Sequence, residues 1–159
     1  MDVKEIVINK KLVVGIKIFT SNANESNPET ALIPSLWQRF FSENIAEQIQ
    51  NKLDESNLLG VYTEYDDEHR GHYSVIVGQQ VSALENISEE FVSLEILAGR
   101  YLIFSEAGDM PAVIFSLWQK IWDYFSDNKN HQRAFTTDFE LYSNDSPSKI
   151  DIYVALKES

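Results

Sequence analysis

Apolar side chains recur at intervals of three and four residues in two separate segments of the chain. After Pro34 the recurring residues are Leu36, Trp37, Phe40, Phe41, Ile45, Ile49 and Leu53. After Pro111 they are Val113, Leu117, Trp118, Ile121, Trp122 and Phe125. This spacing places them on one face of a helix, and proline is well tolerated in the first turn of a helix. The pattern therefore predicts two amphipathic helices, the first of about five turns.

Shorter apolar runs, typical of strands, surround each predicted helix. One run precedes the first helix and two follow it, at residues 12–19, 60–65 and 73–77. The second helix has the same surroundings, at residues 101–104, 134–142 and 150–156. The polar stretch 20–30 predicts a loop, and residues 82–97 predict a linker with one extra strand-like element. The order β-α-β-β is thus expected twice.

This repetition predicts an α+β fold built from a duplicated β-α-β-β unit. The segments Leu36-Trp37-Gln38-Arg39 and Leu117-Trp118-Gln119-Lys120 stand at matching places in the two copies. We expect one domain over residues 1–159, with halves at roughly 1–81 and 97–159, because a chain of this length normally makes a single core. Two such halves can pair about a pseudo-twofold axis and leave a central cleft, where ligands usually bind.

The charge balance narrows the possible partners. Lys and Arg total 13 against 25 Asp and Glu, which gives a formal net charge of −12. Such a surface repels phosphate backbones, so direct nucleic-acid binding is not expected. It favours a cationic ligand or a basic protein partner, unless it serves only solubility. With no cysteine, no signal-like start and no apolar run long enough to span a bilayer, we expect a cytoplasmic protein without membrane contact.

Sequence patterns for catalysis or cofactor binding are weak. His69 and His72 lie three positions apart in an acidic turn, but such a pair without cysteine is typical of ordinary loop residues. The chain contains neither a Gly-rich phosphate loop nor a nucleophile elbow. No cofactor and no metal are expected, and a binding protein is favoured over an enzyme.

Acidic and aromatic residues alternate with apolar ones in the last two predicted strands. Alternate residues of a strand face opposite sides, and the apolar set is expected under the helices: Phe135, Thr137, Phe139, Leu141, Ile150, Ile152, Val154 and Leu156. The other face then carries Asp138, Glu140, Tyr142, Asp151, Tyr153 and Ala155, away from the helices. Either these are solvated residues of an exposed face, or they line the cleft as a receptor for an organic cation.

Several segments together resemble the gyrase-inhibitor-like (GyrI-like) small-molecule-binding family. They are the two Pro-then-Leu-Trp helices, Gly60–Tyr65, Gly99-Arg100-Tyr101, and Asp138–Tyr142 before Ile150–Val154. The family includes the effector-binding domains of AraC-type and MerR-type multidrug regulators, and the resemblance extends from about residue 13 to 157. It implies two SH2-like halves around a cleft, in which a strand-borne glutamate among aromatic residues binds lipophilic cations.

The resemblance also implies roles for individual residues. Glu140 matches the family's glutamate, and Tyr142 follows it as in the Glu-x-Tyr pattern. Trp37, Tyr62, Trp118 and Tyr153 correspond by segment to the aromatic walls.

Three functions are compatible with this reading. The first is a stand-alone domain that senses or sequesters lipophilic, aromatic cations, since no helix-turn-helix pattern stands out. The second is a hydrolase of strained electrophilic natural products, with Glu140 as the base and Tyr142 assisting. The third is a modulator that contacts gyrase or another protein, such as a regulator.

Overall fold

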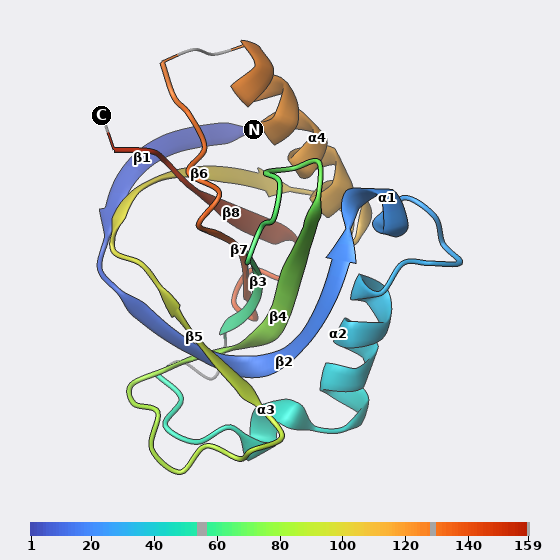
Figure 1. Ribbon diagram of the computed structural model, residues 1–159, viewed down its shortest axis with the longest axis vertical. Coiled ribbons are helices and arrows are strands. Elements are labelled where there is room, and N and C mark those ends of the chain that lie inside the picture. Colours follow the sequence, from blue (N-terminus) through green and yellow to red (C-terminus); the bar gives the residue numbers. More distant parts are fainter. Residues whose placement is uncertain (54–56, 128–129, 159) are drawn as a thin grey trace.

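The computed structural model describes residues 1–53, 57–127 and 130–158 and contains one antiparallel sheet with helices on one side (Figure 1). In chain order the strands are β1 (Asp2–Ile8), β2 (Lys11–Ser21), β3 (Asn57–Thr63), β4 (His72–Val81), β5 (Val92–Ile96), β6 (Gly99–Ala107), β7 (Thr137–Ser143) and β8 (Lys149–Ala155). The helices are α1 (Asn22–Glu25), α2 (Ile33–Ser42), α3 (Ile45–Gln48) and α4 (Ala112–Asp127). No described helix is long and apolar enough to cross a membrane.

The strands follow the order β1-β6-β8-β7-β3-β4-β2-β5 across an 8-stranded sheet. Read outward from the central β7–β3 pair, β7-β8-β6 mirrors β3-β4-β2. Helix α2 connects β2 to β3, and α4 connects β6 to β7, so both connections have the same place in the order. The α+β fold is confirmed, and the duplication of its halves stays a prediction.

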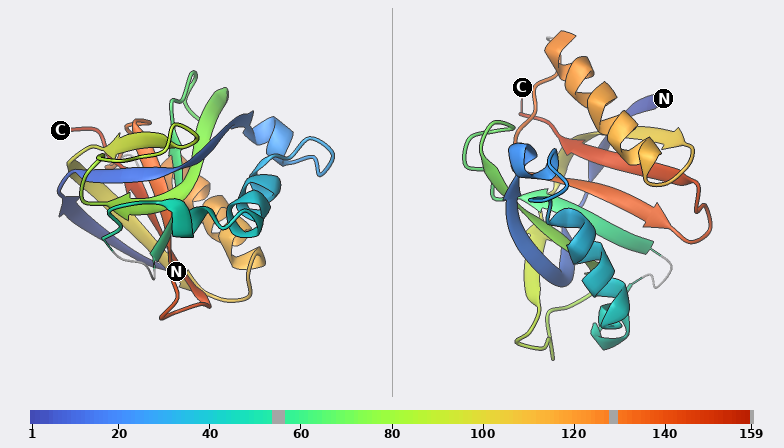
Figure 2. Two further views of the ribbon diagram at one scale, coloured as in Figure 1. Left: turned by 90° about the horizontal axis from the view of Figure 1, so that it is seen from below. Right: turned by 90° about the vertical axis from the view of Figure 1, so that its right-hand side faces the viewer.

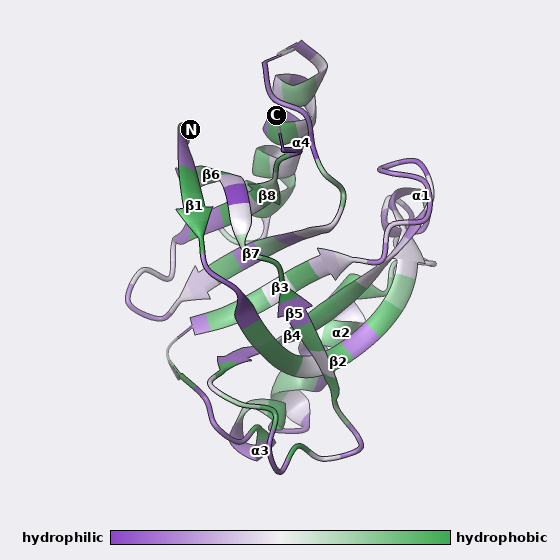
Figure 3. Cartoon of the chain, turned by 60° about the vertical axis from the view of Figure 1, so that its left-hand side comes forward, coloured by the Kyte–Doolittle hydropathy of each residue, from purple (hydrophilic) through white to green (hydrophobic). Residues whose placement is uncertain are grey.

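The sheet is covered on both faces. Helices α2 and α4 lie on the same side of it (Figure 2, right), each over its own apolar cluster. On the other side the sheet curls, and each of the eight strands contributes to a third cluster: Ile8, Val13, Leu59, Val61, Ile76, Ile96, Tyr101, Phe139 and Ala155. Colouring by hydropathy shows long apolar stretches along β2 and β4 (Figure 3). The curled face therefore forms a core of its own, made by strands alone.

Some predicted elements differ from the observed ones. The first long helix is in fact two helices, because Asn44 adopts the left-handed conformation (φ 52°) between α2 and α3. Asparagine tolerates this conformation better than most residues. Leu53, predicted on the helical stripe, lies beyond α3 and is exposed. The predicted loop 20–30 contains the short helix α1, and β1 was not predicted at all.

The predicted orientation of β7 is wrong, whereas that of β8 is confirmed. Glu140 pairs with Ile152, and Phe139 pairs with Tyr153. Directly opposite residues share a face of the sheet. Because Ile150, Ile152 and Val154 contact α4, Asp138, Glu140 and Tyr142 also lie on the helix side. The residues Phe139 and Leu141 face the curled side instead. Any ligand site built on Glu140 is therefore between the helices and the sheet, not on a face that the helices leave open.

Candidate ligand-binding site

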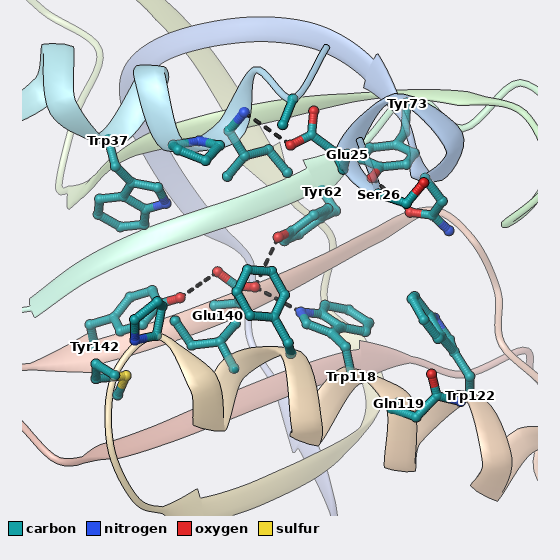
Figure 4. Close-up of a pocket in the computed structure, with 18 of the residues that line it drawn as sticks. Glu25, Ser26, Trp37, Tyr62, Tyr73, Trp118, Gln119, Trp122, Glu140 and Tyr142 are labelled. Carbon is teal, nitrogen blue, oxygen red and sulfur yellow. Dashed lines mark hydrogen bonds between the residues drawn. The ribbon is translucent and has the colours of Figure 1, made fainter. Parts of the chain in front are cut away.

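A cavity of about 710 Å³ lies between α2, α4 and the centre of the sheet, with α1 at one end (Figure 4). Most of its wall is apolar or aromatic. The aromatic lining residues are Trp37, Phe41, Tyr62, Tyr65, Tyr73, Phe115, Trp118, Trp122 and Tyr142. Four large apolar lining residues are also exposed at the surface, namely Phe41, Met110, Phe115 and Trp122. The volume is in the range of sites for drug-sized ligands.

Glu140 lies at the base of this cavity, on the central strand β7. Its side chain is buried, with 2% of the residue exposed. Oε2 accepts hydrogen bonds from Tyr62 Oη at 2.9 Å and Trp118 Nε1 at 2.7 Å, and Oε1 accepts one from Tyr142 Oη at 2.6 Å (Figure 4). The donors come from β3, α4 and β7, so they hold the carboxyl group from three directions.

No Lys, Arg or His of the described residues forms an ion pair with Glu140. Burial raises the pKa of the Glu140 carboxyl group above its ordinary range, and the three hydrogen bonds oppose this shift in part. The hydroxyl pKa values of Tyr62 and Tyr142 are raised well above the ordinary value by burial and by the nearby carboxylate. Both therefore remain hydrogen-bond donors. Glu140 is a buried carboxyl group with neutral partners, which a cation can stabilise in its charged form.

The absence of a side chain at Gly60 gives the carboxyl group its space. Gly60 on β3 pairs directly with Glu140 on β7. A Cβ atom at this position would lie 2.8 Å from Glu140 Oε1 and 3.3 Å from Trp37 Cζ2. Both distances are shorter than ordinary van der Waals contact, so a glycine lets Trp37 and the carboxyl group approach the sheet together.

Gly60→Ala is expected to destabilise the fold by about 1–2 kcal/mol, because the added methyl group presses on a hydrogen-bonded side chain. In a Glu140→Ala background the space is free, and the same substitution should cost clearly less. Urea unfolding of the four proteins of this cycle measures the coupling. An equal cost in both backgrounds would mean that the methyl group meets no resistance from Glu140.

Asp138 is close to the cavity but is already neutralised. It is fully buried, and Oδ2 accepts from Arg133 Nη2 and Tyr65 Oη, both at 2.6 Å. Oδ1 accepts from the backbone N–H of Ala155 at 2.9 Å. The Arg133 guanidinium group lies over the ring of Phe135, at 4.2 Å from its centroid. Asp138 and Arg133 form a structural ion pair, so Asp138 is not a free receptor for a cation.

Glu25 is a second carboxylate on the cavity wall. It lies on α1, and Oε2 accepts from Thr20 Oγ1 at 2.6 Å and the backbone N–H of Leu32 at 2.8 Å. Oε1 accepts from the backbone N–H of Ile33 at 3.1 Å. Glu25 thus caps the first turn of α2, where anionic groups are favourable. No local motif in the polar stretch 20–30 marked this residue.

The structure brings together five of the six predicted ligand residues. Glu140, Tyr142, Trp37, Tyr62 and Trp118 line the cavity. Tyr153 does not, because it lies on the curled face of the sheet and stacks on Phe139 with ring centroids 4.4 Å apart. Its predicted place in the site is wrong, for the same reason as the orientation of β7. The role of the other five in binding stays a prediction.

The sequence patterns did not indicate that several further residues line the cavity. Tyr65 and Tyr73 belong to the predicted strands 60–65 and 73–77, but nothing in their spacing indicated that they reach the cavity. Phe115 and Trp122 lie seven residues apart on α4 and therefore on the same side of this helix. Trp122 belongs to the apolar stripe that the sequence predicts, whereas Phe115 does not. An unusually aromatic outer face of this helix was the available signal.

Comparison with known proteins decides the family. Residues 6–156 match the family model described as integron-associated effector binding protein, Cass2. This chain belongs to that family. A solved structure of the integron cassette protein VCH_CASS2, from the mobile metagenome of Vibrio cholerae, has a TM-score of 0.81 at 34% identity, covering 98% of this chain and 95% of that one.

Further relatives extend the comparison. SAV2435, solved with bound tetraphenylphosphonium, has a TM-score of 0.80 at 19% identity, covering 99% of this chain and 94% of that one. This likeness shows a common fold. YobU of Bacillus subtilis is 26% identical over 156 residues, 95% of either chain. The transcriptional regulator BrlR of Pseudomonas aeruginosa is 23% identical over 150 residues, and the match spans 91% of this chain but 51% of BrlR. This chain is thus similar in sequence to proteins named as transcriptional regulators.

Proposed function

We propose that this chain binds lipophilic organic cations in the cavity between α2 and α4, with Glu140 as the residue that selects for positive charge. The observation that carries the proposal is the state of Glu140: buried, hydrogen-bonded to three neutral donors, and without a cationic partner among the described residues. A buried carboxylate is costly unless a positive charge is near it. A bound cation would supply that charge.

The walls of the cavity suit the rest of such a ligand. Trp37, Tyr62, Trp118 and Tyr142 surround the carboxyl group and present ring faces and edges to the space above it. Each ring that lies face-on to a desolvated cation adds on the order of 0.5–2 kcal/mol. The apolar residues Phe41 and Phe115 at the opening would cover hydrophobic substituents of the ligand.

The relatives support the class of ligand and suggest a biological setting. Membership in a family of effector-binding proteins supports a small-molecule ligand for this chain. SAV2435 is a protein of the same fold that binds a lipophilic cation, tetraphenylphosphonium. We place the chain with the GyrI-like domains of multidrug-responsive regulators, as a domain that senses or sequesters its ligand. A DNA-binding segment or a protein partner would convert binding into regulation.

The symmetry of the strand order supports an origin of the site from two halves. The central β7–β3 pair joins β7-β8-β6 to β3-β4-β2, and α2 and α4 bound the cavity from the two halves. We propose that these halves are copies about a pseudo-twofold axis. In an experimental structure, α2 with β2, β3 and β4 should superpose on α4 with β6, β7 and β8. Failure to superpose would contradict the duplication and leave the binding proposal intact.

Aromatic cations such as tetraphenylphosphonium are expected to quench tryptophan fluorescence with a dissociation constant in the micromolar range, about −8 kcal/mol. The reason is that Trp37, Trp118 and Trp122 all line the cavity. Titration with a neutral and an anionic analogue of equal size, for example tetraphenylmethane derivatives and tetraphenylborate, provides the comparison. Both should bind distinctly less well. Equal affinity for the three charge types would exclude Glu140 as a charge selector.

A further inference from the structure

The cavity has carboxylates at two places. Glu140 is on the sheet strand β7, and Glu25 is on α1, beyond Tyr62 in the close-up (Figure 4). Glu25 is partly buried. Its role as a cap of α2 uses two acceptor positions of Oε2 and one of Oε1. A carboxylate offers about four such positions, so the cap leaves part of Oε1 available to another group.

Positive charges on the cavity wall do not balance these two carboxylates. The lining residues of opposite charge are Arg133 and, when protonated, His69. Arg133 is bound to Asp138 at 2.6 Å, and that pair is neutral as a unit. Within the described ranges, no Lys, Arg or His forms an ion pair with Glu25. The cavity therefore contains two carboxyl groups that no cationic side chain of the described residues neutralises.

Tyr73 lines the same cavity and lies beside Glu25 in the close-up (Figure 4). Its hydroxyl group lines the cavity and donates to Asn22 Oδ1 at 2.8 Å. Burial raises the Tyr73 pKa, and the charges of Glu25 and Glu140 raise it further. Tyr73 and Asn22 thus provide further polar groups beside Glu25 on the wall of this cavity.

We propose that the cavity accommodates elongated organic dications, with one cationic group at Glu140 and the second at a subsite formed by Glu25, Tyr73 and Asn22. This inference rests on the proposed function, since it assigns a second position within the same cavity. The aromatic and apolar wall between the two carboxylates would contact the uncharged body of such a ligand. A monocation of the same length would use Glu140 and leave Glu25 unpaired.

Matched pairs of ligands test the subsite. The probes are α,ω-bis(trimethylammonium)alkanes and n-alkyltrimethylammonium ions of equal chain length, in a series of lengths, titrated into the full chain by calorimetry. At the best length the dication is expected to bind about five- to tenfold more tightly than its matched monocation, as a partly exposed charge pair allows. This preference should weaken as salt is added.

Three variants separate the charge of Glu25 from its role as a cap. Glu25→Gln should abolish the preference for the dication and change monocation affinity by less than about twofold. Thr20→Val removes one hydrogen bond to Glu25 but keeps its charge, so the preference should persist. Glu29→Gln deletes a charge from an exposed residue of the same connection, outside the cavity, and should have no effect.

The outcomes distinguish this inference from the proposed function. If wild-type protein binds both ligand types equally at all lengths, the subsite is excluded while cation binding stands. If Thr20→Val loses the preference as completely as Glu25→Gln, Glu25 acts as a helix cap alone, and the inference is wrong. If neither ligand type binds wild-type protein, the proposed function itself fails. The wild-type comparison does not depend on the stability of any variant.

Discussion

Glu140→Gln is expected to reduce the affinity for lipophilic cations by about ten- to a hundredfold, equivalent to about 1.5–3 kcal/mol. The substitution keeps the shape of the side chain and deletes the charge that a bound cation would contact. Glutamine can still accept from Tyr62 and Trp118 through its carbonyl oxygen. Its amide would face Tyr142, whose hydroxyl group can rotate to accept. The cavity wall should therefore survive the substitution, so the loss reports the charge.

The Glu140→Gln substitution should affect the stability of the fold differently from the affinity for cations. Because the Glu140 pKa is raised in the folded protein, the folded state holds more protons than the unfolded state between the ordinary glutamate pKa and the raised value. The contribution of Glu140 to stability is thus greatest below this window and is lost as the pH rises through it. Above the window, Glu140→Gln should melt at a temperature equal to or higher than that of wild type. Thermal denaturation of both proteins over a pH series measures this.

The same pKa shift predicts proton release on binding. A cation favours the ionised carboxylate, so its affinity should increase as the pH rises through the raised pKa of Glu140. Tyr62 and Tyr142 also contact this carboxyl group, but their raised pKa values keep them protonated throughout. Calorimetry in two buffers of different ionisation enthalpy measures the released proton, which Glu140→Gln should eliminate. Glu95→Gln, at an exposed position of β5, is the matched control. Unchanged affinity in the Glu140 variant would exclude the carboxylate as the cation receptor.

The sequence predicted the helices and strands correctly where one buried face gives the apolar residues a regular spacing. Leu117 and Ile121 of α4 are buried at helical spacing, and Ile150, Ile152 and Val154 alternate toward the same helix. Residues 45–53 repeat the helical spacing too, but the left-handed Asn44 interrupts the helix before them. Spacing alone does not detect a break of one residue. Chain length, alternation and two prolines therefore sufficed for the fold class but not for every helix boundary.

The sequence did not predict which residues of β7 face the helices, for a different reason. A strand buried on both faces has no exposed side, so alternation between acidic and apolar residues no longer separates inside from outside. Asp138 and Glu140 are buried carboxylates, while Phe139 is buried in the cluster on the other side. Assuming that the acidic face was open placed Tyr153 in the site and the cleft on the wrong side of the sheet. Glu25 was missed because a side chain that caps a helix seven residues later leaves no local pattern.

Asp138→Asn is expected to destabilise the protein by about 3–5 kcal/mol, because it leaves the buried charge of Arg133 without a partner. Both side chains are almost inaccessible, at 0% and 7% exposure, and their atoms are 2.6 Å apart. Asparagine can still accept from the backbone of Ala155 but cannot neutralise the guanidinium group. Asp138 lies two residues before Glu140 on the same face of β7. It nevertheless has a structural function, in contrast to the binding function proposed for Glu140.

A double-mutant cycle with Arg133→Met separates the charge from the packing. Methionine fills part of the space over Phe135 and removes the cation, so Asp138→Asn should cost much less in the Arg133→Met background. Urea unfolding of the four proteins at one pH gives the coupling free energy. If the free energy of unfolding of the Asp138→Asn variant lay within about 1 kcal/mol of the wild-type value, the ion pair would contribute no more than an exposed pair does. That result would contradict a buried pair. Because the Asp138–Arg133 pair is buried, Asp138→Asn should be among the most destabilising single substitutions near the cavity. Glu140→Gln, two residues along the strand, should leave stability almost unchanged.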